Sequence, residues 1–345
     1  MTTRVGLLGA TGAVGQRFVQ LLEPHPEFDL AVLTASDESA GKPYREAAKW
    51  RVDTPIPEAL ADEPVVATTP SAVSDDVELV FSALPSDAAA AVEPAFAEAG
   101  FVVCSNASND READDVPLVI PEVNADHLGL LDVQRDTRGW DGALVKNPNC
   151  STITLVPTLA ALVPFGLERV RVATLQAVSG AGYSGVTSME IIDNALPHIA
   201  GEAEKIAAES RKLLGTFDGD EVVWHDADVS ASCNRIATID GHLENVWAEL
   251  ADDVTPEAAA EAMRSYPSLD LHSSPEPLIT VFDAMDRPQP RLDRLLGGGM
   301  GVSAGGIEAV PGGGLKYNCL AHNTIRGAAG ASVLNGELLI RDGWV

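Results

Sequence analysis

"RVGLLGATGAVGQRFVQLLE", residues 4–23, sets a glycine-rich turn between a short apolar run and an amphipathic segment. The apolar run predicts a buried strand, and the residues after the turn repeat apolar side chains at helical spacing. Glycines at positions 9, 12 and 15 allow a tight turn and the close approach of a pyrophosphate to a helix N-terminus. The spacing is G-x-x-G-x-x-G, so the stretch is a variant of the dinucleotide-binding loop.

The segments that follow alternate between strand and helix patterns. Strands are predicted at 28–36, 77–84 and 101–108, with a helix at 86–100. Such alternation is typical of a parallel sheet covered by helices on both faces. The first part of the chain is therefore predicted to be a Rossmann-type α/β domain.

The pattern changes after residue 150. Strand-like alternation dominates, and helical patterns are interspersed, which predicts a second α+β domain with a mixed or antiparallel sheet. The predicted strand regions are 169–182, 222–250 and 277–284, and the predicted helices are 152–162, 188–199, 202–214, 255–266 and 322–340. We expect residues 1–149 to form the dinucleotide-binding domain, completed by a C-terminal helix in 324–345. Residues 150–323 are expected to form a catalytic and dimerisation domain.

Composition restricts the partners. The 345 residues carry 51 acidic and 23 basic side chains, a net charge of −28, which repels nucleic acid and anionic membranes. Only six of the basic residues are lysines, a balance that suggests adaptation to high salt, where acidic repulsion is screened. No apolar run is long enough to span a bilayer, and the first residues lack a signal-peptide pattern. A soluble cytoplasmic protein acting on a small molecule is expected.

One cysteine lies where a strand is predicted to stop and a helix to start, in "NPNCST", residues 147–152. A helix N-terminus stabilises a thiolate at Cys150, and its free N–H groups can form an oxyanion hole. The alternative is an ordinary buried cysteine in a strand-to-helix connection. The other three cysteines are distant and form no C-x-x-C pair, so neither a disulfide framework nor a zinc site is expected.

A partner for this cysteine is available in "RIATIDGH", residues 235–242. A turn at Asp240 and Gly241 brings Arg235 and His242 toward one cavity, although residues seven apart in a strand face opposite sides. The histidine can exchange a proton, and the arginine can hold a carboxylate with two hydrogen bonds. Taken singly, each residue fits a surface or structural role better than a catalytic one.

Eight motifs in this order make the chain resemble the aspartate-semialdehyde dehydrogenase family, in the style of its archaeal and fungal branch. They are GATGAVGQRF, TASDESAGK, SNASNDR, NPNCST, QAVSGAGYSG, GEAEKIAAES, RIATIDGH and HNTIRGAAG. The resemblance implies a reversible, phosphate-dependent reduction of aspartyl-4-phosphate by NADPH to aspartate 4-semialdehyde, which feeds lysine, threonine and methionine synthesis. It also implies a homodimer or homotetramer, and a haloarchaeal source would account for the acidity.

The resemblance also implies roles for individual residues. Cys150 is expected to form a thioester by attacking the acyl phosphate, with His242 as general acid–base and Gln176 orienting the substrate. The implied contacts are Arg235 with the α-carboxylate, Glu202 with the α-ammonium, and Lys205, Arg111 and Asn149 with phosphate. The implied cofactor-binding residues are Thr11, Gly12, Ala13, Val14, Ser36, Ser39, Ser179, Gly180 and Asn323.

Two departures from the family pattern leave alternatives open. Glu38 stands where related sequences often have an arginine, and Asp37 suits a ribose 2′-hydroxyl, so NAD competes with the expected NADP. The stretch GGIEAV, residues 305–310, lacks expected arginines. Rival functions are a malonyl-CoA reductase-like thioester reductase, the more distant N-acetylglutamyl-phosphate reductase and a non-catalytic nucleotide sensor.

Overall fold

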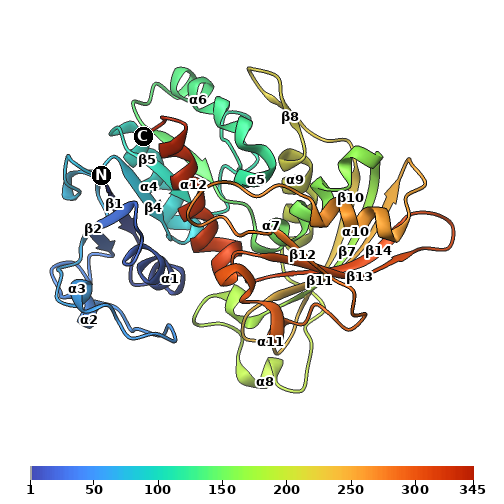
Figure 1. The fold of residues 1–345 in the computed structure, drawn as a ribbon. Helices are drawn as coiled ribbons and strands as arrows, with labels where there is room; N and C mark the ends of the chain where they lie inside the picture. The colour runs from blue at the N-terminus through green and yellow to red at the C-terminus, as the bar shows by residue number, and fades with distance from the viewer. Residues whose placement is uncertain (1) are drawn as a thin grey trace.

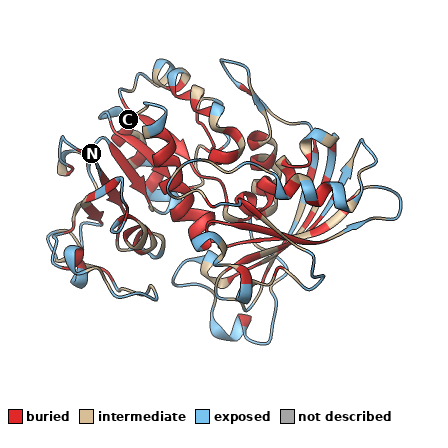
Figure 2. Cartoon of the chain, in the orientation of Figure 1, coloured by how far each residue is buried: buried red, intermediate tan, exposed pale blue. Residues whose placement is uncertain are grey.

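The computed structural model describes residues 2–345 and contains two six-stranded sheets. In Figure 1 the sheet built from the N-terminal part of the chain lies on the left with both termini, and the second sheet lies on the right. The strands of both sheets are largely buried, whereas the loops at their ends are exposed (Figure 2).

The first sheet is entirely parallel and has the strand order β3-β2-β1-β4-β5-β6. This is a Rossmann order, and its topological switch point lies between β1 and β4, where ligands bind beyond the carboxyl ends of the strands. The strands are β1 (Thr3–Leu8), β2 (Phe28–Ala35), β3 (Val66–Ala67), β4 (Leu79–Ser82), β5 (Val102–Ser105) and β6 (Ala143–Lys146). The longer helices of this part are α1 (Ala13–Leu22), α4 (Ser86–Glu98) and α6 (Leu130–Arg138).

Helices cover both faces of this sheet. Leu7 and Phe81 point into the same core cluster as Phe18 of α1, whereas the next residue of β1, Leu8, packs with Phe96 of α4. Successive side chains of a strand point to opposite faces, so each buried strand supplies both layers. The predicted parallel α/β architecture is confirmed.

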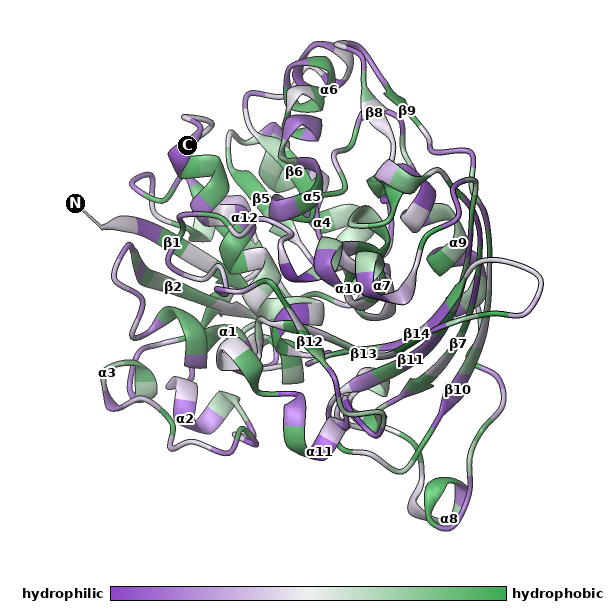
Figure 3. Cartoon of the chain, turned by 45° about the vertical axis from the view of Figure 1, so that its right-hand side comes forward, coloured by the Kyte–Doolittle hydropathy of each residue, from purple (hydrophilic) through white to green (hydrophobic). Residues whose placement is uncertain are grey.

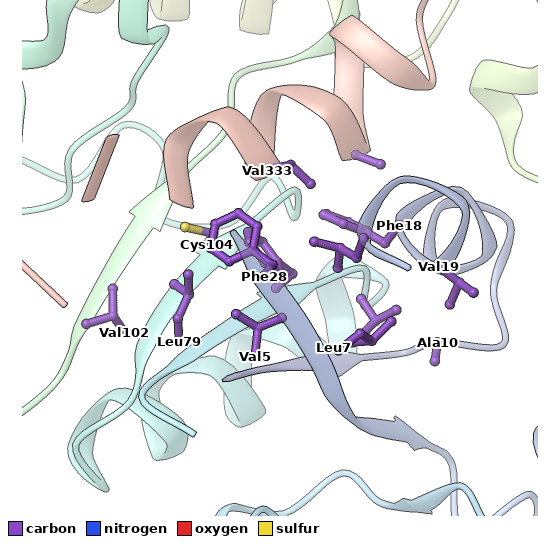
Figure 4. Close-up of a cluster of buried hydrophobic side chains, with 14 of the residues drawn as sticks. Val5, Leu7, Ala10, Phe18, Val19, Phe28, Leu79, Val102, Cys104 and Val333 are labelled. Carbon is purple, nitrogen blue, oxygen red and sulfur yellow. The ribbon is translucent and has the colours of Figure 1, made fainter. Parts of the chain in front are cut away.

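The C-terminal helix α12 (Gly330–Arg341) returns to the first sheet. Its Val333 lies in the same cluster as Phe18, Phe28 and Leu79, and Figure 4 shows Val333 above these side chains. A single π-helical turn, η6 (Ile325–Ala329), precedes α12. The predicted helix over 322–340 is therefore present, but its first turn is wider than an α-helix.

The glycine loop begins where β1 ends. Gly9 has a φ of +78°, a conformation that favours glycine. A Cβ at Gly15 would lie 2.8 Å from the carbonyl carbon of Ala10, so a side chain there would push α1 away from the loop. The glycines thus let the N-terminus of α1 sit directly against the end of β1.

The second sheet is mixed and has the order β10-β7-β11-β14-β13-β12. Its outer pairs, β10 with β7 and β12 with β13, are parallel, and the inner pairs are antiparallel. Its strands are β7 (Leu167–Gln176), β10 (Asp228–Arg235), β11 (His242–Leu250), β12 (Ile279–Phe282), β13 (Val302–Ala309) and β14 (Leu315–Ala321). The predicted mixed sheet of the second domain is confirmed.

Three helices pack against this curved sheet (Figure 3): α7 (Cys150–Ala160), α9 (Glu202–Leu213) and α10 (Pro256–Arg264). Along β11, His242, Glu244 and Val246 are buried, while Trp247 is 42% exposed. Every second side chain of β11 is therefore buried on the face of the sheet that the helices cover.

The remaining elements are short, and one predicted helix is wrong. Of the segment 188–199, only Ser188–Ile191 is helical, because Asp193 adopts a φ of +57° and the chain leaves the helical path. Within residues 2–345, no helix is both long and apolar enough to cross a bilayer. The other short elements are α2 (Tyr44–Ala47), α3 (Glu58–Ala61), α5 (Pro121–Asn124), α8 (Ser188–Ile191), α11 (Pro290–Asp293), β8 (Thr216–Phe217) and β9 (Val222–Val223).

Candidate active site

The cysteine occupies the first position of α7, directly after β6 of the first sheet and a three-residue turn. Asn149 is the N-cap, and its side-chain oxygen accepts hydrogen bonds from the backbone N–H groups of Ser151 (2.9 Å) and Thr152 (3.3 Å). Those two N–H groups are therefore occupied in the free protein. The oxyanion hole expected from them is not available while Asn149 caps the helix.

A histidine faces the sulfur. His242, the first residue of β11, lies with Nε2 3.2 Å from Sγ of Cys150. On its other side, Nδ1 accepts a hydrogen bond from the backbone N–H of Ala177 at 3.1 Å. A backbone N–H only donates, so Nδ1 carries no proton and the neutral ring holds its proton on Nε2, toward the sulfur.

Burial keeps this pair uncharged. It raises the pKa of the Cys150 thiol to about 12, an effect that Glu202 adds to and that Arg235 opposes. Burial and the nearby Arg235 guanidinium lower the pKa of His242 to about 3. Loss of solvation therefore opposes the stabilisation of a thiolate that is expected from the helix N-terminus.

This result predicts the pH dependence of alkylation. A thiol whose pKa is raised stays protonated below that pKa, so the reactive thiolate fraction grows about tenfold per pH unit from about pH 7 to about pH 10. We expect iodoacetamide to modify Cys150 with that slope and without a plateau, as measured by mass spectrometry of the tryptic peptide. Cys150→Ser reports the background from the buried cysteines, and a plateau near pH 6 would instead indicate a preformed thiolate–imidazolium pair.

Two strand ends bring further polar groups to the sulfur. Arg235 ends β10 and pairs in parallel register with Gln176 at the end of β7. Its Nη1 donates to the carbonyl oxygen of Ala177 at 2.8 Å and lies 3.5 Å from Oε1 of Gln176. A Cβ on Gly180 would lie 2.8 Å from Nη1 of Arg235 and 3.3 Å from Cε1 of His242. Glycine at this position leaves the arginine and the histidine side by side.

A single carboxylate gathers three of the predicted substrate-binding groups. Glu202, the first residue of α9, accepts hydrogen bonds from Nδ2 of Asn149 at 2.9 Å and from Nε2 of Gln176 at 3.4 Å. Nζ of Lys205 lies 3.4 Å from its other oxygen, one helical turn along. The side chains of Asn149, Gln176 and Lys205 thus converge on Glu202 at the start of α9.

Arg111 reaches the same region from the first domain. It is 7% exposed, and its guanidinium donates to Glu209 of α9 at 2.9 Å and to the carbonyl oxygen of Asn106 at 2.7 Å. Glu209 also accepts a hydrogen bond from the backbone N–H of Asn149 at 2.6 Å. Arg111 is therefore joined to the start of the cysteine helix through one carboxylate.

A cleft of about 350 Å³ lies between the first turns of α1 and the loop after β7. Ala13 and Val14 line it from α1, and Ser179 lines it from the second domain. Asn323 donates to Oγ of Ser179 at 2.8 Å and accepts from the backbone N–H of Gly241 at 2.8 Å, so it ties this wall to the turn before His242. Of the other predicted cofactor residues, Thr11, Gly12, Ser36, Ser39 and Gly180 do not line this cleft.

Four residues near these sites were not predicted from the sequence. Glu209 had a signal, because it lies seven residues after Glu202 and so shares its helix face. Ala177 acts through its backbone, which no side-chain pattern reveals. Arg51 stacks on the ring of Tyr183, 3.4 Å from its centroid, and both residues line the cleft, although they are far apart in sequence.

Comparison with known proteins agrees with this geometry. Residues 4–131 match the family described as semialdehyde dehydrogenase, NAD binding domain, and residues 158–326 match the semialdehyde dehydrogenase dimerisation domain. The chain is 54% identical over 342 residues to an aspartate-semialdehyde dehydrogenase of Archaeoglobus fulgidus, with 99% of each chain covered. It is 45% identical over 354 residues to that of Schizosaccharomyces pombe, covering 99% of this chain and 98% of the relative.

Solved structures give the same result. A crystal structure of aspartate semialdehyde dehydrogenase with NADP from Candida albicans superposes with a TM-score of 0.91 at 39% identity, over 100% of both chains. Aspartate semialdehyde dehydrogenase II of Vibrio cholerae, complexed with ASA, superposes with a TM-score of 0.78 at 26% identity, over 99% of both chains. The resemblance carried by the sequence motifs is confirmed, and the chain belongs to the aspartate-semialdehyde dehydrogenase family.

Proposed function

We propose that this chain is an NADP-dependent and phosphate-dependent aspartate-semialdehyde dehydrogenase, which reduces aspartyl-4-phosphate to aspartate 4-semialdehyde in lysine, threonine and methionine synthesis. The observation that carries the proposal is the contact between Cys150 and His242 at the start of α7, beside Arg235 and Glu202. A nucleophile, a proton-bearing group and a pair of opposite charges for an amino acid are the components that this reaction needs. Relatives across the whole chain length carry the same name.

The glycine loop fits a dinucleotide. Within residues 2–345 no side chain caps the N-terminus of α1, so its first N–H groups are free to bind a pyrophosphate, and Gly15 lets this end of the helix lie against the backbone of Gly9 and Ala10. We assign Thr11, Gly12, Ala13 and Val14 to that contact, Ser36 and Ser39 to the adenosine phosphate, and Ser179, Gly180 and Asn323 to the nicotinamide side. When bound, NADPH supplies the hydride that reduces the thioester; the Candida albicans relative was solved with NADP.

In the proposed reaction, the sulfur of Cys150 attacks the acyl carbon, the carbon–oxygen bond to phosphate breaks, and a thioester forms. Because burial holds Cys150 as a thiol, the S–H bond breaks as the sulfur attacks, and the proton leaves with the departing phosphate, since Nε2 of His242 already carries one. Arg235 and Arg111 both lower the pKa of the thiol. These two cations therefore favour the negative charge that develops on the sulfur as the S–H bond breaks.

His242 is proposed as the acid–base partner, acting mainly as a hydrogen-bond donor. Its Nε2–H points to the sulfur while Nδ1 accepts from Ala177. An imidazolium would need a proton on Nδ1 as well. That N–H would then face the backbone N–H of Ala177, and neither group could accept a hydrogen bond. The ring is thus suited to stabilise the sulfur anion first and then the oxygen anion of the tetrahedral intermediate.

We propose that the charged groups of the substrate bind side chains of opposite charge. Arg235 binds the α-carboxylate, Glu202 binds the α-ammonium, and Gln176 orients the carbonyl group beside the sulfur. Glu202 is supported in this role because its carboxylate is buried among three donors, which an ammonium group can partly replace. Arg111, Asn149 and Lys205 are assigned to the phosphate.

This assignment predicts a kinetic effect of Arg235→Lys. Lysine keeps the charge but cannot make two parallel hydrogen bonds to a carboxylate, so the KM for aspartate semialdehyde should rise about tenfold or more while kcat changes less. Arg264→Lys is a matched control, because Arg264 forms an ion pair with the exposed Asp283. An unchanged KM in Arg235→Lys would remove Arg235 from the carboxylate site.

Domain division and assembly are proposed on the same basis. All strands of the first sheet lie within residues 3–146, and those of the second within 167–321, which supports a boundary at 149/150 with 324–345 returning to the first domain. We propose a cytoplasmic homodimer or homotetramer, supported by the match to a dimerisation domain. The net charge of −28 supports function at high salt.

The function is tested by steady-state assay of aspartate semialdehyde oxidation. Reduction of NADP that requires phosphate is the expected result, and the same assay with NAD measures the effect of the acidic Glu38 on cofactor choice. CoA in place of phosphate tests the thioester-reductase rival. Assays at low and multimolar salt test halophily. Cofactor binding without turnover under all these conditions would favour a nucleotide-sensing protein.

A further inference from the structure

The phosphate side of the site depends on a carboxylate to which the proposed reaction gives no role. Glu209 lies on α9, is 1% exposed, and connects two segments that are far apart in the sequence, those of Arg111 and Asn149. One oxygen accepts a hydrogen bond from Nη1 of Arg111 at 2.9 Å, and the other accepts one from the backbone N–H of Asn149 at 2.6 Å. The side chain thus links a proposed phosphate-binding guanidinium to the residue that caps the cysteine helix.

This bridge requires two acceptor oxygens at a fixed separation. Both partners are donors, and an ionised carboxylate accepts at both of its oxygens. A glutamine at this position would present an NH₂ group to one of the two donors, and that contact would be lost. An aspartate keeps both acceptors and the charge, but its side chain is shorter by one methylene.

Helix α9 also binds the segment around Arg111 through a second side chain, that of Lys212. Nζ of Lys212 donates to the backbone carbonyl oxygens of Arg111 (2.9 Å), Ala113 (2.6 Å) and Val116 (2.8 Å). Lys212 is 1% exposed and lies three residues after Glu209, so both side chains share a face of the helix. The segment around Arg111 is therefore fixed to α9 at its backbone by the lysine and at its side chain by the glutamate.

We propose that Glu209 is a positioning residue for the phosphate subsite. It holds the Arg111 guanidinium and the first turn of α7 in one relative geometry, so that an oxyanion bound by Arg111 lies next to Cys150. The inference rests on the proposed function, since it specifies how that reaction orients phosphate. Because Glu209 acts through Arg111 and Asn149, its loss should weaken the use of phosphate more than the use of aldehyde or cofactor.

The test is Glu209→Gln, assayed in the direction of aspartate semialdehyde oxidation. We expect the KM for phosphate to rise about tenfold or more and kcat to fall, while the KM values for aspartate semialdehyde and NADP stay within about twofold. Glu337→Gln is a closely matched control. Glu337 is also 1% exposed and also accepts from one side chain, His25, and one backbone N–H, that of Ser273, away from the sulfur.

A purely structural role would give a different pattern. In that case Glu209→Gln and Glu337→Gln would both lower the melting temperature and leave the KM for phosphate unchanged, and the proposal would be overturned. If Glu209→Gln does not fold, Glu209→Asp keeps the charge, and the same selective rise in the KM for phosphate is expected because the shorter side chain cannot reach both donors.

Failure of the proposed function is distinguishable from failure of this inference. If the unmodified protein shows no phosphate-dependent turnover, inorganic phosphate can be tested for protection of Cys150 against iodoacetamide, which needs no reaction. Protection that is present in the unmodified protein and lost in Glu209→Gln supports the positioning role. Equal protection in both proteins, or protection in neither, overturns it.

Discussion

Cys150→Ala is expected to reduce turnover by about 10⁴-fold or more, because it removes the sulfur that forms the thioester while leaving His242 and Arg235 in place. NADP affinity should stay within about twofold, since the residues assigned to the cofactor do not include Cys150. Steady-state assays measure the first effect, and fluorescence titration with NADPH measures the second. Mass spectrometry of the unmodified protein under turnover should find an acyl adduct on this cysteine.

Cys104→Ala is the control for this substitution. Cys104 is 1% exposed in the hydrophobic core of the first sheet, so its loss should cost stability, about 1 kcal/mol, and leave kcat nearly unchanged. Activity of Cys150→Ala above about 1% of normal, with no adduct in the unmodified protein, would contradict covalent catalysis through this sulfur.

His242 should show a graded response that depends on the hydrogen-bond donor. His242→Ala is expected to lower kcat by about 10³-fold, the size of effect seen when one oxyanion donor is lost. His242→Gln places an amide N–H near the position of Nε2 and is expected to retain about tenfold more activity than the alanine variant. Both values come from steady-state kinetics at saturating substrate.

The pH profile provides an independent check of the histidine. Burial lowers its pKa to about 3, so the ring stays neutral above that value and no imidazole ionisation should be visible near pH 6.5 in kcat/KM. Equal losses in the alanine and glutamine variants, together with an ionisation near pH 6.5, would show that full proton transfer is the main contribution of His242.

Local patterns in the sequence were sufficient to predict the architecture of both sheets. The glycine loop, the alternation of apolar runs and the change of pattern after residue 150 predicted a parallel sheet followed by a mixed one, and both are present. These features are encoded by spacing within a few residues, which is why sequence reasoning reaches them. The prediction of a helix over 188–199 was wrong, because Asp193 adopts a positive φ that the spacing of apolar residues did not reveal.

By itself, the sequence determined the two kinds of sheet, the place of the glycine loop and a cysteine at a strand-to-helix junction, since each depends on neighbours along the chain. Only the tertiary structure decided the state of that cysteine. Desolvation by surrounding segments raises the pKa of Cys150, and a backbone N–H from residue 177 sets the tautomer of His242. Likewise, Glu209 meets Arg111 and Asn149 across the domain boundary. Solvation and hydrogen-bond direction depend on atoms brought together from distant parts of the chain, and no local pattern records them.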